Sequence, residues 1–199
     1  MNKLFKFFLR LNKKNGKTIV LKNVFKTKYN KKILLSYVRH VFDHDSYKNS
    51  KSHTNHYTTY IIGEILNELG YDVDAINHDV CIDNDFSNYD LVIGLGATLE
   101  HVLKNRNSKS PKVIWFGTGC NPFFSNPITL KRISDFYAKN NVLIPESSRF
   151  IKQDDPLQHE LADWIILHGK SFSKSTYRSN NNSFTRFNIT ACCCPDHAQ

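Results

Sequence analysis

From residue 32 onward, short apolar runs alternate with segments in which apolar residues recur at a helical period. Continuous apolar runs of about four to eight residues are typical of strands that helices cover on both faces. Such runs predict strands at 33–38, 90–95, 112–116 and 164–167, and the alternating segment YDVDAI predicts a further strand at 71–76.

The segments between these runs have the spacing of helices. In 58–69, Ile61, Ile65 and Leu69 share one helical face, and Gly70 follows where a helix-ending glycine is expected. Further helices are predicted at 97–105, 127–139, 157–162 and 171–178. In 127–139, the residues with core-like spacing are Ile128, Leu130, Ile133 and Phe136.

Strands that alternate with helices imply right-handed βαβ units and a parallel sheet. The length of 199 residues suits one domain with a full-sized core. We therefore predict one α/β domain at 32–190, with a Rossmann-like parallel sheet and helices on both faces. A basic arm at 1–31 precedes it, and an irregular tail at 191–199 follows it.

The formal net charge of +9 is unevenly distributed. Eleven of the 27 Lys and Arg residues lie in 1–32, which contains no Asp or Glu. The rest of the chain contains 16 basic and 18 acidic residues. A nucleic-acid-binding domain would carry its basic residues across the folded surface. No nucleic acid partner is therefore predicted, whereas a basic segment at 1–28 suits an anionic membrane surface.

The first residues of the arm are amphipathic. Leu4, Phe8 and Leu11 share a helical face, and Lys6 and Arg10 interrupt the apolar run, which argues against a secretory signal or a membrane span. Two interpretations stay open: a short interfacial helix on an anionic membrane, or a solvated leader with one packed turn. The expected location is cytoplasmic, either free or peripheral on the inner membrane face.

The five cysteines are Cys81, Cys120 and the adjacent run 192–194. An odd number with three in a row is not a disulfide framework, so a reducing compartment is the simpler expectation. Adjacent cysteines also suit tetrahedral zinc poorly, because zinc ligands are usually separated by two to four residues.

Ligands of open parallel sheets bind outside the carboxyl ends of the strands. Three predicted strands are followed there by glycine and small polar residues, in GLGAT at 94–98, GTGCN at 117–121 and HGKSFS at 168–173. Tight turns of any such fold also use glycine. The substrate-binding candidates in these loops are Gly94, Gly96, Gly117, Thr118, Gly119, Asn121 and Gly169.

The glycine loops do not form a nucleotide-cofactor motif. Leu99 and Pro122 stand where G-x-G-x-x-G requires its third glycine, and the loop after the first strand contains no glycine. The P-loop pattern is absent as well. No cofactor is therefore predicted.

A polar loop at 39–55 is rich in histidine. His53 and His56 have a spacing that metal ligands also use, but such clusters in polar loops also serve substrate binding or face solvent, and no metal is predicted. We take His53 as the candidate catalytic base, because its loop follows the first strand and histidine titrates near neutrality. A structural or hydrogen-bonding role for His53 remains the alternative.

Three segments resemble the N-terminal, acceptor-side domain of bacterial GT-B-class glycosyltransferases of the group 1 or family 4 type. The first is ILLSYV at 33–38 with HTN at 53–55 and LGYDVD at 69–74, the second is WFGTGCNPFFSN at 115–126, and the third is LADWIILHGKSFSKSTY at 161–177. They cover most of 33–178 in the family's order. The resemblance adds Thr54, Asn55 and Asn126 to the substrate-binding candidates.

The resemblance implies an acceptor-binding half of an enzyme that moves a sugar from a nucleotide-sugar donor to a glycan or lipid-linked acceptor. Thr58 and Thr59 stand where the family has a carboxylate, Asn121 replaces a histidine, and Lys170 replaces an asparagine. The family's donor-binding domain has no counterpart in 199 residues. We expect either a truncated enzyme or one completed by a partner chain that carries the donor domain. The alternative is a non-catalytic membrane-surface binding or adaptor module of the same fold.

Overall fold

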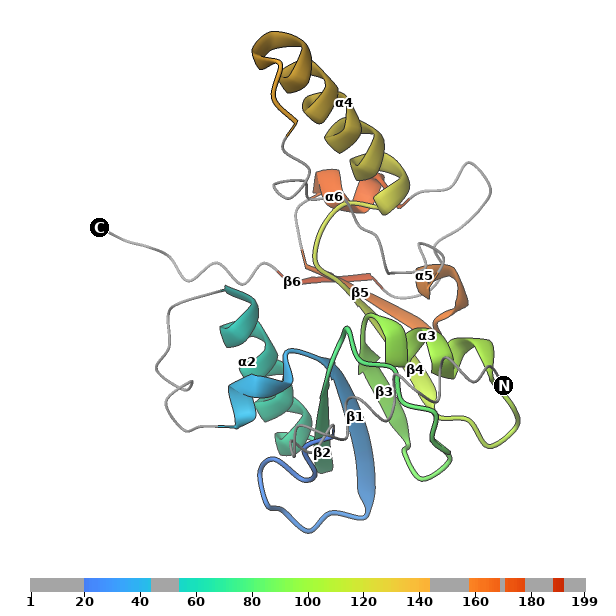
Figure 1. Ribbon diagram of the computed structural model, residues 1–199. Coiled ribbons are helices and arrows are strands. Elements are labelled where there is room, and N and C mark those ends of the chain that lie inside the picture. The colour runs from blue at the N-terminus through green and yellow to red at the C-terminus, as the bar shows by residue number, and fades with distance from the viewer. Residues whose placement is uncertain (1–19, 44–53, 144–157, 169–170, 178–187, 192–199) are drawn as a thin grey trace.

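The computed structural model describes residues 20–43, 54–143, 158–168, 171–177 and 188–191, and these form one layered α/β unit (Figure 1). Its centre is a six-stranded sheet in the order β2-β1-β3-β4-β5-β6, in which every neighbouring pair is parallel. The strands are β1 (Lys31–Tyr37), β2 (Tyr71–Asn77), β3 (Leu91–Gly94), β4 (Lys112–Gly117), β5 (Trp164–His168) and β6 (Asn188–Ala191). The five predicted strands and the Rossmann-like α/β class are confirmed, and β6 is an addition.

The helices lie between the strands along the chain. They are the 3-10 helix η1 (Arg39–Phe42), α2 (Thr54–Glu68), α3 (Ala97–Lys104), α4 (Pro122–Asn140), α5 (Gln158–Leu161) and α6 (Ser171–Ser175). The helix α4 starts five residues before the predicted 127, because Asn121 caps it and Pro122 occupies the first turn. Pro127, the first residue of the predicted helix, lies inside it.

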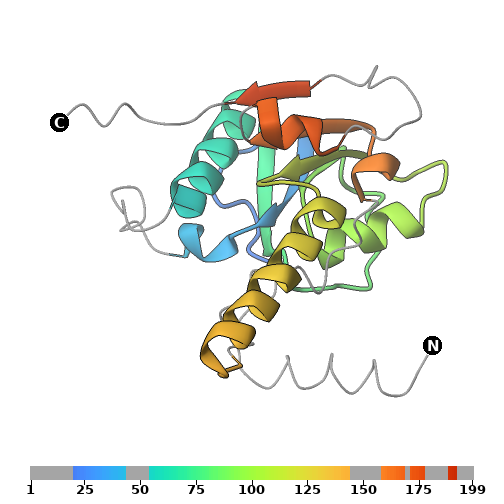
Figure 2. The ribbon, with the colours of Figure 1, turned by 90° about the horizontal axis from the view of Figure 1, so that it is seen from above.

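Alternate residues of β1 belong to two cores, one on each face of the sheet. Ile33 and Leu35 pack with Leu66 of α2, whereas Leu34 packs with Leu99 of α3. The two helices therefore cover opposite faces, as Figure 2 shows from above. Burial on both faces explains why β1 is a continuous apolar run rather than an alternating one.

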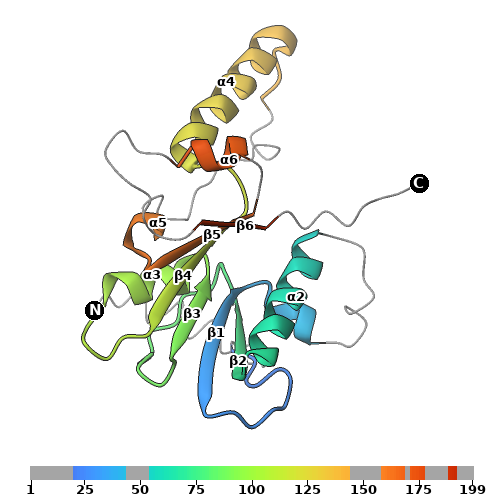
Figure 3. The same cartoon turned by 180° about the vertical axis from the view of Figure 1, so that it is seen from behind.

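The helix α4 does not pack as its sequence suggested. Ile128, Leu130 and Phe136 are 47%, 55% and 39% exposed, and within the helix only Thr129 is buried. The helix projects away from the sheet (Figures 1 and 3). The prediction of a core-facing stripe is therefore wrong: helical spacing shows that a face is apolar but does not show what covers it. Among the described helices, none is both long and apolar enough to cross a membrane.

Part of the predicted arm lies against the outer strand β2. Leu21 and Ala75 exchange two backbone hydrogen bonds of 2.9 and 2.8 Å, and the amide of Val24 donates to the carbonyl of Val73 at 2.8 Å. This segment, 20–30, therefore continues the hydrogen bonding of the sheet beyond β2.

One carboxylate anchors that segment. The buried Asp74 accepts hydrogen bonds from Lys22 Nζ at 2.7 Å, the Tyr89 hydroxyl at 2.7 Å and the Asn23 amide at 2.8 Å. Burial raises the pKa of Tyr89 to about 12, the bond to Asp74 adds to the rise, and Lys22 opposes it. Burial also opposes the charge of Lys22, but its bonds to Asp74 and Tyr89 outweigh this effect and raise its pKa.

Replacing Asp74 should therefore destabilise the whole domain. We expect Asp74→Ala to lower the free energy of unfolding by about 3 kcal/mol, because it leaves a buried phenol and an amide without their acceptor. Urea denaturation followed by circular dichroism measures the change. The control is Asp135→Ala, which removes an exposed carboxylate of α4 and should cost less than about 0.5 kcal/mol. Equal effects of the two substitutions would contradict the anchoring role.

Candidate functional site

The strand order places a topological switch between β1 and β3, because the connection from β2 to β3 passes over β1. Ligands of such sheets bind outside the carboxyl ends of the two strands at the switch. We use the term carboxyl edge for the carboxyl ends of β1, β3, β4 and β5 with the described residues that follow them. It consists of residues 38–43, 94–97, 117–121 and 168. The candidate site lies there, as the glycine loops of the sequence predict.

A buried phenol lies at the centre of this edge. Tyr37 ends β1, is 4% exposed, and packs edge-on against Phe116 with ring centroids 5.6 Å apart. Among the described residues, its hydroxyl has no hydrogen-bond partner of normal geometry. Burial raises its pKa to about 12, and Thr118 lies near enough to oppose the rise slightly. Buried hydroxyls are rarely left unpaired, and the group nearest to pairing with this inaccessible oxygen is the hydroxyl of Thr118.

Two histidines meet beside the loop after β1. His40 of η1 and His56 of α2 have Nε2 atoms 3.2 Å apart, and their rings are nearly perpendicular, at 88°. At this distance one imidazole donates a proton and the other accepts it. The contact fixes the first turn of α2 against the carboxyl edge, where Thr54 is exposed and Asn55 is half-buried. His53, the predicted catalytic base, lies outside the described residues.

The two glycines after β3 are explained by close backbone packing. Both have positive φ, 138° for Gly94 and 90° for Gly96, and a Cβ would lie 1.9 Å from the carbonyl oxygen of Ser36 or 2.1 Å from that of His78. The amide of Gly96 also donates to Gln158 Oε1 at 3.2 Å. The structure thus gives these glycines a packing role, and their predicted contact with substrate stays a prediction.

The loop after β4 combines one tight glycine with one open glycine. A Cβ at Gly117 would meet the Trp115 ring at 2.3 Å, whereas a Cβ at Gly119 would meet no atom within 4 Å. Thr118 is exposed between them. Gly119 and Thr118 therefore leave the space above the edge clear.

The same loop connects to the segment after β5. The amide of Asn121 donates to Thr176 Oγ1 at 2.9 Å, and Asn121 Oδ1 caps α4 by accepting from the Phe123 amide at 2.9 Å. Asn121 is buried, so both of these observed roles are structural. Asn126 is half-buried inside α4, and Gly169 lies outside the described residues.

Sequence reasoning overlooked Tyr37, His40 and His168. His168 ends β5 and stacks on Phe116, with ring centroids 6.5 Å apart and an angle of 13°. Both Tyr37 and His168 are the last residues of their strands, so the rule that ligands bind at carboxyl ends could have found them. The pairing of His40 with His56 depends on tertiary structure and gave no sequence signal.

Within the described ranges, no three His, Cys, Asp or Glu side chains are grouped so that they could hold a metal ion. Comparison with protein-family models, curated proteins and solved structures finds no match to this chain.

The state of the Tyr37 hydroxyl can be tested directly. We expect Tyr37→Phe to leave the free energy of unfolding unchanged or to raise it by about 1 kcal/mol, because it removes a buried polar atom that has no partner. Chemical denaturation measures this effect. The matched substitution Tyr89→Phe should lower the same quantity by about 2 kcal/mol, because that hydroxyl bonds to Asp74. A loss at Tyr37 as large as that at Tyr89 would show that the Tyr37 hydroxyl is already paired.

Proposed function

We propose that this chain is the acceptor-binding half of a glycosyltransferase that moves a sugar from a nucleotide-sugar donor to a glycan or lipid-linked acceptor. A second domain, on the same polypeptide or on a partner chain, would hold most of the donor. The observation that supports this proposal best is that parts of the three glycosyltransferase-like segments meet at the carboxyl edge, whereas 69–74 of the first segment lies at the amino end of β2.

The contacts between these segments are specific. The end of the first strand, Tyr37, lies beside Thr118 of the second segment. The second segment bonds to the third through Asn121 and Thr176, and Cys120 Sγ lies 3.9 Å from Ser173 Oγ. Residues far apart in sequence thus contact one another at the carboxyl edge.

The groups on this surface suit an acceptor that carries hydroxyls. Thr118 offers an exposed hydroxyl that can donate and accept, and His40 and His56 bring imidazole groups, a common type of general base, to the same edge. A transferase needs such a base to remove the proton from the attacking acceptor hydroxyl. The departing nucleotide diphosphate needs cationic or dipolar stabilisation, which the donor domain would supply in this proposal.

Blocking the edge should abolish acceptor binding without unfolding the protein. We expect Gly119→Trp to weaken binding of a glycan or lipid-linked acceptor at least tenfold, because the new side chain enters open space above the edge. Calorimetry against a panel of such acceptors measures the change. Glu68→Trp, at an exposed position at the end of α2 and away from both the carboxyl edge and the loop 105–111, is the control and should leave affinity unchanged. Absence of binding to every acceptor, with or without nucleotide sugar, would count against the proposal.

The alternative is a non-catalytic module of the same fold that binds an anionic membrane surface. The exposed apolar residues of α4 favour it, because large exposed apolar patches usually mark an interaction site. The helix also carries Lys131, Arg132 and Lys139 against one acidic residue, Asp135. Both features suit a negatively charged bilayer surface, which the basic arm would also contact.

Vesicle co-sedimentation separates the two candidates. We expect deletion of residues 1–19 to weaken binding to vesicles that contain an anionic lipid, and Leu130→Asp in α4 to weaken it further. The deletion stops at 19 because Leu21 and Lys22 hold the described segment against β2. If vesicle binding stays unchanged after both changes, the membrane interpretation is wrong. The control for the added charge is Ser134→Asp, at another exposed position of α4.

A further inference from the structure

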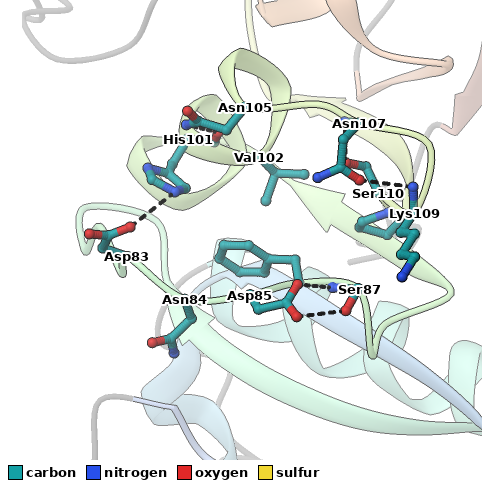
Figure 4. Close-up of a pocket in the computed structure, with 12 residues that line it drawn as sticks. Asp83, Asn84, Asp85, Ser87, His101, Val102, Asn105, Asn107, Lys109 and Ser110 are labelled. Atoms are coloured by element: carbon teal, nitrogen blue, oxygen red, sulfur yellow. Dashed lines mark hydrogen bonds and ion pairs between the residues drawn. The ribbon is translucent and has the colours of Figure 1, made fainter.

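A second site lies away from the carboxyl edge. The loop 83–87, the outer side of α3 and the loop 105–111 enclose a pocket of about 260 Å³ (Figure 4). Its position near the starts of β3 and β4 puts it at the opposite end of these strands from Gly94 and Gly117. We propose that this pocket binds one neutral sugar residue.

The floor of the pocket is apolar and rigid. Phe86, Val102 and Pro111 line it, and all three are buried. Phe86 and Val102 belong to the core between α3 and the sheet, so the floor is fixed by the fold. An aromatic ring and two aliphatic side chains suit the apolar C–H face of a sugar ring, since burying that face against them removes it from water.

The rim is polar and offers both donors and acceptors. Asn84, Asn105 and Asn107 bring amide groups, which can each donate and accept, and Ser87 and Ser110 bring hydroxyls. The loop that carries Asn107 is held in place by its own hydrogen bonds, from the Asn107 amide to Ser110 Oγ and from the Lys109 amide to Asn107 Oδ1, both of 2.8 Å. A sugar hydroxyl needs a donor and an acceptor at once, and this rim offers both.

The charges of the rim select against anions. Asp83 and Asp85 face a single lysine, Lys109, and His101 lies 3.7 Å from Asp83. Hydrogen bonds from Ser87 lower the pKa of Asp85, so this carboxylate is ionised at neutral pH. A phosphate or nucleotide would meet two carboxylates, whereas a neutral hydroxyl group finds charged acceptors and a charged donor. The pocket therefore favours an uncharged polyhydroxyl ring.

The volume agrees with one ring rather than a large ligand. Sites for drug-sized molecules have volumes of about 300–1,000 Å³, and this pocket is slightly smaller. The inference is derived from the lining of the pocket alone and does not depend on sugar transfer at the carboxyl edge. If both sites operate, the pocket would hold a distant residue of the same glycan or a separate one.

Titration of the ¹⁵N-labelled full chain followed by amide chemical shifts tests the proposal. The probes are D-glucose and N-acetylglucosamine, with glycerol as an acyclic polyol and glucose 1-phosphate as an anion. We expect the two neutral sugars to shift amides of 83–87 and 105–110 saturably, in the millimolar range expected of so small a ligand. Amides of 117–121 should not move at the same concentrations, which separates this site from the carboxyl edge.

Matched variants connect the shifts to the rim. Asn84→Ala and Lys109→Ala should each weaken sugar binding roughly fivefold, because each removes one hydrogen-bonding group from an exposed position. Asn88→Ala, in the same loop but outside the lining, should change it less than about twofold. Three results would overturn the proposal: no saturable shift with either sugar, equal shifts with glycerol, or tighter binding of glucose 1-phosphate. Equal losses in the Asn84 and Asn88 variants would overturn it as well.

Discussion

The strand β1 holds this structure together. It is hydrogen-bonded to β2 along its whole length and to β3 over four residues, and its residues Ile33, Leu34 and Leu35 are almost fully buried between the two helical layers. A buried backbone must have its hydrogen bonds satisfied, so β1 fixes the register of both neighbours. Because the chain continues to one side of β1 for β2 and to the other for β3, the same strand also creates the switch point at its carboxyl end. Fold and candidate site therefore have one common origin.

The sequence predicts the parts of the fold that depend on burial from both sides. The strands were found because residues covered on two faces must all be apolar, as in β1 and β4. The helix α4 shows where this reasoning fails: its apolar spacing is real, yet Leu130 and Phe136 face outward. Its start was also placed five residues too late, because the predicted range did not include Asn121 and Pro122, which cap and begin the helix. The strand β6 was missed because it is short and follows a polar stretch at 179–183.

The candidate site could be located from sequence, but its members could not be chosen. Glycines pointed to the carboxyl edge, yet Gly94 and Gly96 are explained by the close approach of Ser36 and His78. The buried Tyr37 hydroxyl, which has no partner of normal geometry among the described residues, could not be singled out from the sequence. Whether a polar atom is paired depends on tertiary neighbours, and a linear sequence does not contain that information. The pocket beside α3 could not be predicted from the sequence for the same reason, because its two loops come together only in the fold.

The contact of segment 20–30 with β2 has a consequence for the behaviour of the molecule in solution. An outer strand with free amides and carbonyls invites pairing with another chain, which leads to edge-to-edge aggregation. Here the bonds of Leu21 and Val24 to Ala75 and Val73 occupy that edge, and Asp74 holds the covering segment in place. The segment covers the edge of β2 and so prevents another chain from pairing with it on this side of the sheet. Loss of Asp74 would therefore expose the backbone amides and carbonyls of β2 to pairing with another chain, and it would also destabilise the domain.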